Sequence, residues 1–240
     1  MKRFLLLLAL LPAFALAKNT TKSDYTTVPL SVGGTTVNFP LSNGYVRASV
    51  KTPEVFAVTA AAVGTQNRLI ESFYTQADAR RVTSGALAED VFYAVQVFRE
   101  LEGKQISAGE WAQAKPGLAA QMGSLDMNAL MRDDAAGMNQ RVRAVSQQDV
   151  DIVFGQMGRP MVYGTDAESI RFMMVLPVSF STAGQTVEVK LAAAGAVLHV
   201  RNKVIFVYTY QQYHAPADLE RVRQTLGTLV TRTLAVANKP

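Results

Sequence analysis

The stretch of sequence that decides the fold lies near the C-terminus, from residue 186 to 213, and reads TVEVKLAAAGAVLHV-RNK-VIFVYTYQQY. Between residues 187 and 191, apolar and charged side chains alternate, which indicates a strand with one face toward water. From 204 to 208 both faces are apolar, so we expect a central strand that is covered on both sides. The tripeptide at 201–203 is a turn, and strands joined by so short a turn are antiparallel neighbours.

Other parts of the chain carry further strand signals that extend this pair into a larger sheet. Gly33-Gly34 separates two alternating runs, and this pair suits the positive φ angles of a hairpin turn. The run at 88–101 could also be helical, but its aromatic and β-branched residues favour a strand. The additional predicted strands cover residues 28–32, 35–39, 45–50, 68–74, 88–101, 150–155 and 170–180.

The end of the chain predicts a helix at 217–236 that packs on this sheet. Its apolar face carries Leu219, Val222, Leu226, Leu229 and Val230. Each of these side chains stabilises the fold by about 1.5 to 3 kcal/mol when buried. Together the elements predict an α+β fold. We expect a mostly antiparallel sheet of about six to eight strands, covered by helices, with the C-terminal helix packed on the sheet.

Helices are also expected in the middle of the chain. Thr52-Pro53-Glu54 has the residue types of a helix start, and Ser107 with Glu110 forms a capping box. The polar region at 107–144 is predicted as a helical insertion on the sheet, and Pro116-Gly117 should kink or split its first helix. Residues 26–240 are therefore expected to form a single globular domain.

The N-terminus has the pattern of a cleavable signal peptide over residues 1–17. Two basic residues precede an apolar run at 4–11, and small residues lead up to the expected cleavage between Ala17 and Lys18. The apolar run is shorter than the roughly 20 residues that a membrane-spanning helix needs, so we expect no transmembrane segment after cleavage. Residues 18–25 are predicted as a flexible leader. The signal predicts a periplasmic or secreted protein.

Composition excludes several classes of function. The chain has no cysteine, which rules out disulfides, thiolate nucleophiles and thiolate metal sites. Its net charge is +5 and its arginines are scattered among acids and amides, unlike the dense basic stripe of a nucleic-acid groove. We therefore expect no nucleic-acid partner.

No motif in the sequence defines a catalytic, cofactor or metal site, so we predict none of these. The two histidines, His199 and His214, have no ligand partners close in sequence. A nucleophile elbow and a phosphate-binding loop are both missing from the sequence. Tyr208 and Tyr210 fall on one face of their strand and offer apolar rings with polar tips. These two tyrosines and His199 are the candidate residues of a ligand-binding surface.

Three segments of the chain resemble a group of proteobacterial secreted proteins to which no function is assigned. The segments are FPLSNGY at 39–45, TQNRLI at 65–70, and the ending from Val204 onward. The resemblance covers most of the chain after the signal peptide, and it implies no activity and no functional residues. More distantly, the order of elements is similar to that of the Mog1/PsbP-like α/β/α sandwiches, which implies an architecture and not a function.

These observations favour an exported, non-enzymatic periplasmic protein that serves as an accessory or binding module of the bacterial envelope. Its partner would be an envelope protein or a small ligand, and no cofactor is expected. The alternative is a periplasmic hydrolase with an unrecognised site at His199 or His214. A third hypothesis is a secreted effector. The sequence leaves open whether the protein is an enzyme, and we lean toward a protein that is not.

Overall fold

The structure, a computed structural model, describes residues 24–182 and 185–237. The predicted signal peptide at 1–17, its cleavage position at Ala17-Lys18 and most of the predicted leader at 18–25 lie outside the described residues. The first strand begins at Tyr25.

Eight strands among the described residues form one antiparallel sheet, with the order β3-β4-β5-β10-β9-β8-β6 and with β7 also paired to β8. The strands are β3 (Tyr45–Arg47), β4 (Asn67–Thr75), β5 (Phe92–Phe98), β6 (Val150–Phe154), β7 (Met161–Thr165), β8 (Ser169–Thr182), β9 (Gln185–Val200) and β10 (Lys203–Gln212). The predicted α+β fold with an antiparallel sheet is confirmed. β10 is central, as expected, because it pairs with both β5 and β9.

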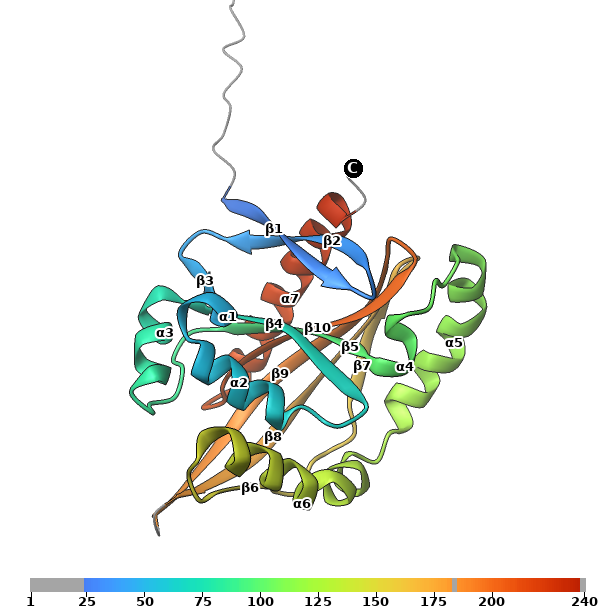
Figure 1. Ribbon diagram of the computed structural model, residues 1–240. Helices are drawn as coiled ribbons and strands as arrows, with labels where there is room; N and C mark the ends of the chain where they lie inside the picture. Colours follow the sequence, from blue (N-terminus) through green and yellow to red (C-terminus); the bar gives the residue numbers. More distant parts are fainter. Residues whose placement is uncertain (1–23, 183–184, 238–240) are drawn as a thin grey trace, which may run out of the picture.

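One face of the sheet is covered by the C-terminal helix α7 (Pro216–Ala237) and by a hairpin of β1 (Tyr25–Val32) and β2 (Thr35–Ser42), as Figure 1 shows. Both glycines of the hairpin turn have positive φ, as that turn requires. Four of the five predicted apolar residues of α7 are buried, and Leu219 is partly buried. The predicted packing of this helix on the sheet is therefore confirmed.

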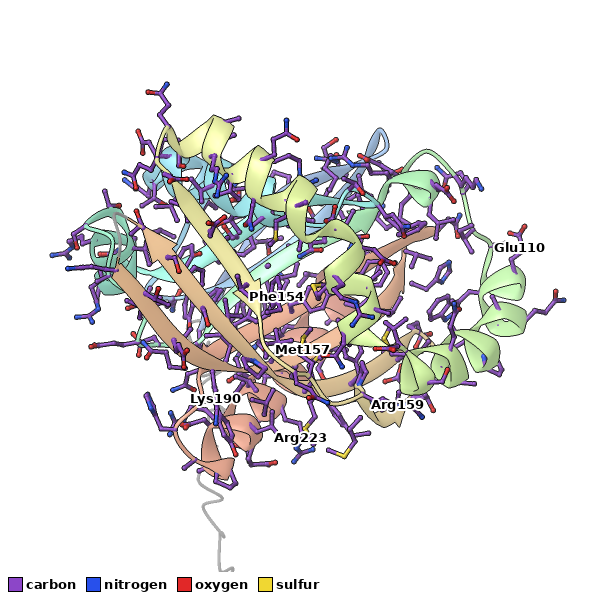
Figure 2. The ribbon with its side chains drawn as sticks, turned by 90° about the horizontal axis from the view of Figure 1, so that it is seen from below. Glu110, Phe154, Met157, Arg159, Lys190 and Arg223 are labelled. Atoms are coloured by element: carbon purple, nitrogen blue, oxygen red, sulfur yellow. The ribbon has the colours of Figure 1, made fainter. Side chains whose placement is uncertain are left out.

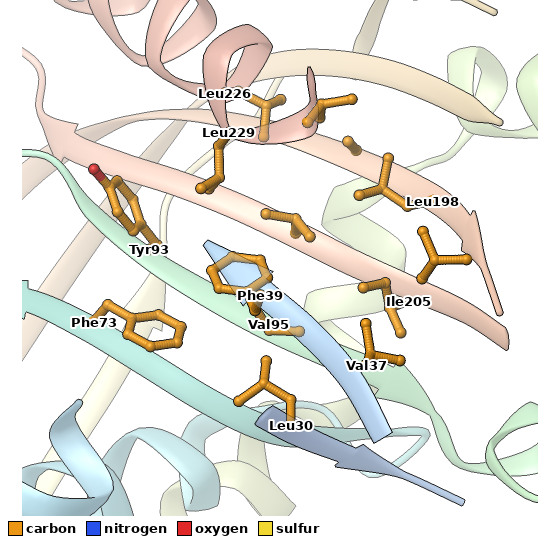
Figure 3. Close-up of a cluster of buried hydrophobic side chains, with 14 of the residues drawn as sticks. Leu30, Val37, Phe39, Phe73, Tyr93, Val95, Leu198, Ile205, Leu226 and Leu229 are labelled. Atoms are coloured by element: carbon orange, nitrogen blue, oxygen red, sulfur yellow. The ribbon is translucent and has the colours of Figure 1, made fainter. Parts of the chain in front are cut away.

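The main hydrophobic core lies between this helix, the hairpin and the sheet. Figure 3 shows Leu226 and Leu229 of α7 above Leu198 and Ile205 of the sheet, and Phe39 of β2 in the same cluster. The rings of Phe39 and Phe73 stack with centroids 5.2 Å apart. A second sheet thus closes over part of the first one, and α7 covers the rest.

The opposite face of the sheet carries the remaining helices (Figure 1). They are α1 (Ala48–Lys51), α2 (Pro53–Ala62), α3 (Gln76–Thr83), α4 (Arg99–Glu102), α5 (Ala108–Ser124) and α6 (Met127–Ser146). Their apolar side chains form four separate clusters on the sheet and not one continuous core. The helical region predicted at 107–144 holds α5 and α6.

The prediction that Pro116-Gly117 kinks or splits the first of these helices is wrong, because α5 runs from Ala108 to Ser124 with Pro116 inside it. Proline removes the hydrogen bond to the carbonyl of Ala112. Both residues lie on the exposed side of α5, so water can donate to that carbonyl instead. The chain breaks instead at Leu125-Asp126, where the Asp126 carboxylate caps the first amides of α6.

Three shorter elements also differ from the prediction. The strand predicted to reach residue 50 is shorter: β3 ends at Arg47, because α1 begins at Ala48. The run at 88–101 contains the predicted strand only from Phe92 to Phe98 and then turns into α4. β7 has no predicted counterpart, since its five residues include Gly164 and lack an alternating pattern. The capping box at Ser107 and Glu110 is present as predicted.

Candidate functional site

The central strand β10 has two unlike faces. On the side of α7, Ile205, Val207 and Thr209 are fully buried. On the helix-covered side, Tyr208 and Tyr210 stay partly exposed, as does Phe206 before them. The expected coverage is therefore complete on the side of α7 and partial on the other side, where Val204 is buried but the aromatic rings stay within reach of solvent.

These rings belong to a row of stacked aromatic side chains that crosses three strands. We call it the aromatic row, and its members are Tyr74 of β4, Phe92 of β5, and Tyr210, Tyr208 and Phe206 of β10. Along the row the ring centroids of neighbours lie 5.2, 5.2, 5.8 and 6.3 Å apart, and the ring planes are nearly parallel. Phe172 of β8 meets Tyr208 edge-on, with centroids 6.1 Å apart. Both arrangements are favourable for aromatic pairs.

Small residues on the strands beside β10 make room for the row. Tyr208 lies opposite Gly195 of β9 and Ala94 of β5, and Tyr210 lies opposite Ala193 of β9. A Cβ atom at Gly195 would come within 2.4 Å of the Phe172 ring, so only glycine permits this ring to lie across β9. The run of alanine and glycine in β9 therefore places large rings on both sides of it.

The hydroxyl groups of Tyr208 and Tyr210 lie among packed aromatic rings but are not fully buried. Burial raises the pKa of both groups well above the ordinary value for tyrosine. In the part of the chain that the structure describes, neither hydroxyl makes a hydrogen bond to the protein. Because the stacked rings use their faces for one another, the row presents ring edges and two free hydroxyls. It can thus offer apolar contact together with hydrogen bonds.

Three groups of helices border the row, and each packs on its own cluster. Phe206 and Tyr208 contact the cluster of Trp111 in α5, Tyr210 contacts the cluster of Met157, and Phe92 contacts the cluster under α2 and α3. Met157 follows β6 beyond Phe154 (Figure 2), and its backbone is held by the side chain of Asn128 at the start of α6. The row therefore joins clusters that the helices keep apart.

His199, the third candidate residue, is held by contacts that support the fold. Its ring stacks on Trp111 with centroids 5.7 Å apart, and its Nε2 lies 2.6 Å from the carbonyl oxygen of Ile106. A carbonyl can only accept, so Nε2 carries the proton in this bond. The residue is 9% exposed. His199 thus ties β9 to the segment that leads into α5.

The structure does not bring the candidate residues into one site. His199 pairs with Val204 at one end of β10, whereas Tyr208 pairs with Gly195 four positions farther along β9. His214 follows the other end of β10 and is exposed. Its backbone amide donates to Asp218 at the start of α7. The two tyrosines are stacked together, and the two histidines lie at opposite ends of the strand.

The described residues also bear on metal sites and on membrane spans. Within residues 24–182 and 185–237, no group of three or more histidine, aspartate or glutamate side chains is placed to hold a metal ion. No helix in the same ranges is both long and apolar enough to span a membrane.

Sequence reasoning found Tyr208 and Tyr210 through the alternation in β10 but missed their neighbours in the row. Phe92 and Tyr74 come from strands more than a hundred residues earlier, and only the cross-strand register brings them to Tyr210. The signal that was available locally was the alternation Phe206-Tyr208-Tyr210.

Comparison with known proteins adds little to this picture. No family model and no curated protein matches the chain. Among solved structures, the chain is similar to the solution structure of cyanobacterial PsbP (CyanoP) from Synechocystis sp. PCC 6803. The identity is 13%, the match covers 81% of this chain and 83% of that one, and the TM-score is 0.31. A similarity this weak carries no conclusion about fold or function.

Proposed function

We propose that the chain is an exported, non-enzymatic binding protein of the bacterial envelope, periplasmic or secreted, that holds a segment of an envelope protein on the aromatic row. The observation that carries this proposal is the pair of partly exposed tyrosines, Tyr208 and Tyr210. Their hydroxyls make no hydrogen bond to a described residue and remain within reach of solvent. A bound partner would cover the apolar rings, and its backbone would take over the hydrogen bonds that water makes to these hydroxyls.

The spacing of the row favours an extended peptide as the partner. The Tyr208 and Tyr210 rings lie 5.8 Å apart along β10. Alternate side chains of an extended strand repeat at roughly 6.6 Å, so successive side chains of a bound segment can meet successive rings. The rings carry no charge, which favours apolar side chains, and each hydroxyl can bond to a backbone amide or carbonyl of the segment.

The hydrolase alternative needs a histidine that is free to act as a base. The Nε2 of His199 is bound to the carbonyl of Ile106, and the exposed His214 lies beyond the end of β10. No observation on the described residues favours a secreted effector either. We therefore propose the binding function alone.

The test removes both hydroxyls and keeps both rings, with the double variant Tyr208→Phe/Tyr210→Phe as bait in envelope extracts. Each lost hydrogen bond weakens binding by about 0.5 to 1.5 kcal/mol, so recovery of the partner should fall roughly tenfold. Tyr213→Phe is the matched control, because Tyr213 follows the same strand but packs into the core on the side of α7. It should recover the partner like the unaltered protein.

Recovery is measured by quantitative mass spectrometry, and folding is checked by urea unfolding of each bait. Because the two hydroxyls have no protein partner, the double variant should be at least as stable as the unaltered protein. Equal recovery of every enriched protein by the double variant and by the unaltered protein would overturn the proposal. So would the recovery of no protein at all.

A further inference from the structure

A second candidate site lies on the opposite face of the sheet from the aromatic row, where α7 meets β2 and β5. A cavity of about 160 Å³ is lined there by Ser42, Tyr93, Thr225, Thr228, Leu229 and Arg232. Four of these six side chains carry a hydroxyl, and one is a cation. A second, more open depression shares Thr228 and Arg232 and continues along the outer side of α7.

Arg232 is held in place at this cavity by three contacts. Its guanidinium lies 5.1 Å from the centre of the Tyr25 ring, its Nη1 is 3.5 Å from the hydroxyl of Ser42, and its Nη2 pairs with the carboxylate of Asp24. Its side chain is only 23% exposed, whereas that of Asp24 is 67% exposed. A guanidinium fixed in this way is arranged in advance to bind a planar carboxylate.

The threonines of α7 divide into two kinds. Thr231 and Thr233 donate to the carbonyls of Gly227 and Leu229 in their own helix, at 3.0 and 2.7 Å, as helical threonines commonly do. Thr225 and Thr228, which line the cavity, make no hydrogen bond to any described residue. Their hydroxyls are free to donate to a molecule in the cavity.

The positive charge of Arg232 affects Tyr93, another residue that lines the cavity. Burial is the largest cause that raises the pKa of Tyr93, and the positive charge of Arg232 acts in the opposite direction on the same group. A ligand in this space therefore meets a partly desolvated cation together with neutral hydroxyl donors. With a single cation in the lining, a singly charged anion is matched better than a doubly charged one.

From this arrangement we infer that the cavity binds a small monocarboxylate, which takes the place of Asp24 on Arg232. The chain already pairs this guanidinium with a carboxylate, so the chemistry of recognition is present. The Asp24 side chain is 67% exposed, so solvent screens its pairing with Arg232 and a ligand can displace it. The ligand gains the hydroxyls of Thr225 and Thr228, which Asp24 does not use.

The experiment titrates the full chain with propanoate, and with propanamide as the uncharged analogue, and follows binding by calorimetry and by amide NMR shifts. Propanoate should bind saturably and shift the amides of α7 around Thr228, and propanamide should not. Asp24→Asn should bind propanoate roughly tenfold more tightly, the factor expected if Asp24 occupies the guanidinium about nine-tenths of the time.

Two further variants separate the site from general charge. Arg232→Gln should weaken propanoate binding at least tenfold, and Thr228→Val should weaken it several-fold while it keeps every charge. Arg223→Gln is the matched control, since Arg223 (labelled in Figure 2) lies on the same helix and pairs with Glu220, an acid that is also exposed. It should bind propanoate like the unaltered protein.

Several results would overturn the inference. These are Asp24→Asn binding no more tightly than the unaltered protein, Arg223→Gln losing as much affinity as Arg232→Gln, and inorganic phosphate binding more tightly than propanoate. If Arg232→Gln does not fold, Thr228→Val decides, and unchanged binding by that variant contradicts the site. The aromatic row lies on the other face of the sheet, so none of these results depends on the proposed function.

Discussion

The substitution Gly195→Ala tests how the sheet accommodates the aromatic row. The added Cβ would lie 2.4, 2.8 and 2.9 Å from three atoms of the Phe172 ring, whereas ordinary van der Waals contact begins at 3.4 Å. The ring would have to retreat by about 1 Å. It has little freedom to do so, because Phe172 is 6% exposed and packs edge-on against Tyr208.

This clash predicts that Gly195→Ala destabilises the protein by about 1 to 3 kcal/mol, the usual cost of overpacking a filled core. In a protein that also carries Phe172→Ala, the same Gly195→Ala substitution should instead stabilise the fold. Phe172→Ala alone costs about 3 to 5 kcal/mol. Once the ring is gone the three close contacts of the new Cβ are gone too, and alanine in a strand is more stable than glycine by roughly 0.5 to 1 kcal/mol.

The four proteins of this cycle are compared by urea unfolding, followed by circular dichroism and by the fluorescence of Trp111, the single tryptophan. Trp111 belongs to the same cluster as Phe172 and reports on its packing. Gly117→Ala is the control, because a Cβ at this exposed helical position meets nothing and should stabilise α5. An equal cost of Gly195→Ala with and without the Phe172 ring would refute the steric explanation.

Two further predictions concern buried carboxylates. Glu71 is fully buried and accepts from Arg47 at 2.7 Å. Glu71→Gln should cost about 2 to 3 kcal/mol in urea unfolding, below the roughly 3 to 5 kcal/mol for breaking a fully buried pair because Arg47 is 34% exposed; a loss under about 0.5 kcal/mol would contradict this. The amides of His214 and Ala215 donate to Asp218 and lower its pKa. The stability that the ionised Asp218 contributes to the fold is therefore complete above the ordinary pKa of about 3.9. It is lost as pH falls through the lowered pKa of the folded protein. Asp218→Asn should flatten the decline of the urea midpoint in acid, and parallel pH curves would count against it.

Local patterns in the sequence determined much of the secondary structure. The Gly33-Gly34 pair placed the hairpin turn, and the Ser107 capping box placed the start of α5. The alternation in β10 placed Tyr208 and Tyr210 on one face. Each of these depends on residues within a few positions of one another, so the backbone geometry of a turn, a cap or a strand is enough to predict it.

Register and packing decided the rest, because these bring together residues that are far apart in the chain. Arg232 meets Asp24 across 208 positions, and Tyr210 finds Phe92 only through the pairing of β10 with β5. Pro116 remains inside a helix because it lies on the exposed side of α5, where water can donate to the carbonyl that it leaves unpaired. Local sequence was enough to determine most of the elements and the face on which the tyrosines lie. The tertiary structure decided which rings and charges become neighbours, since no local pattern records contacts across strands.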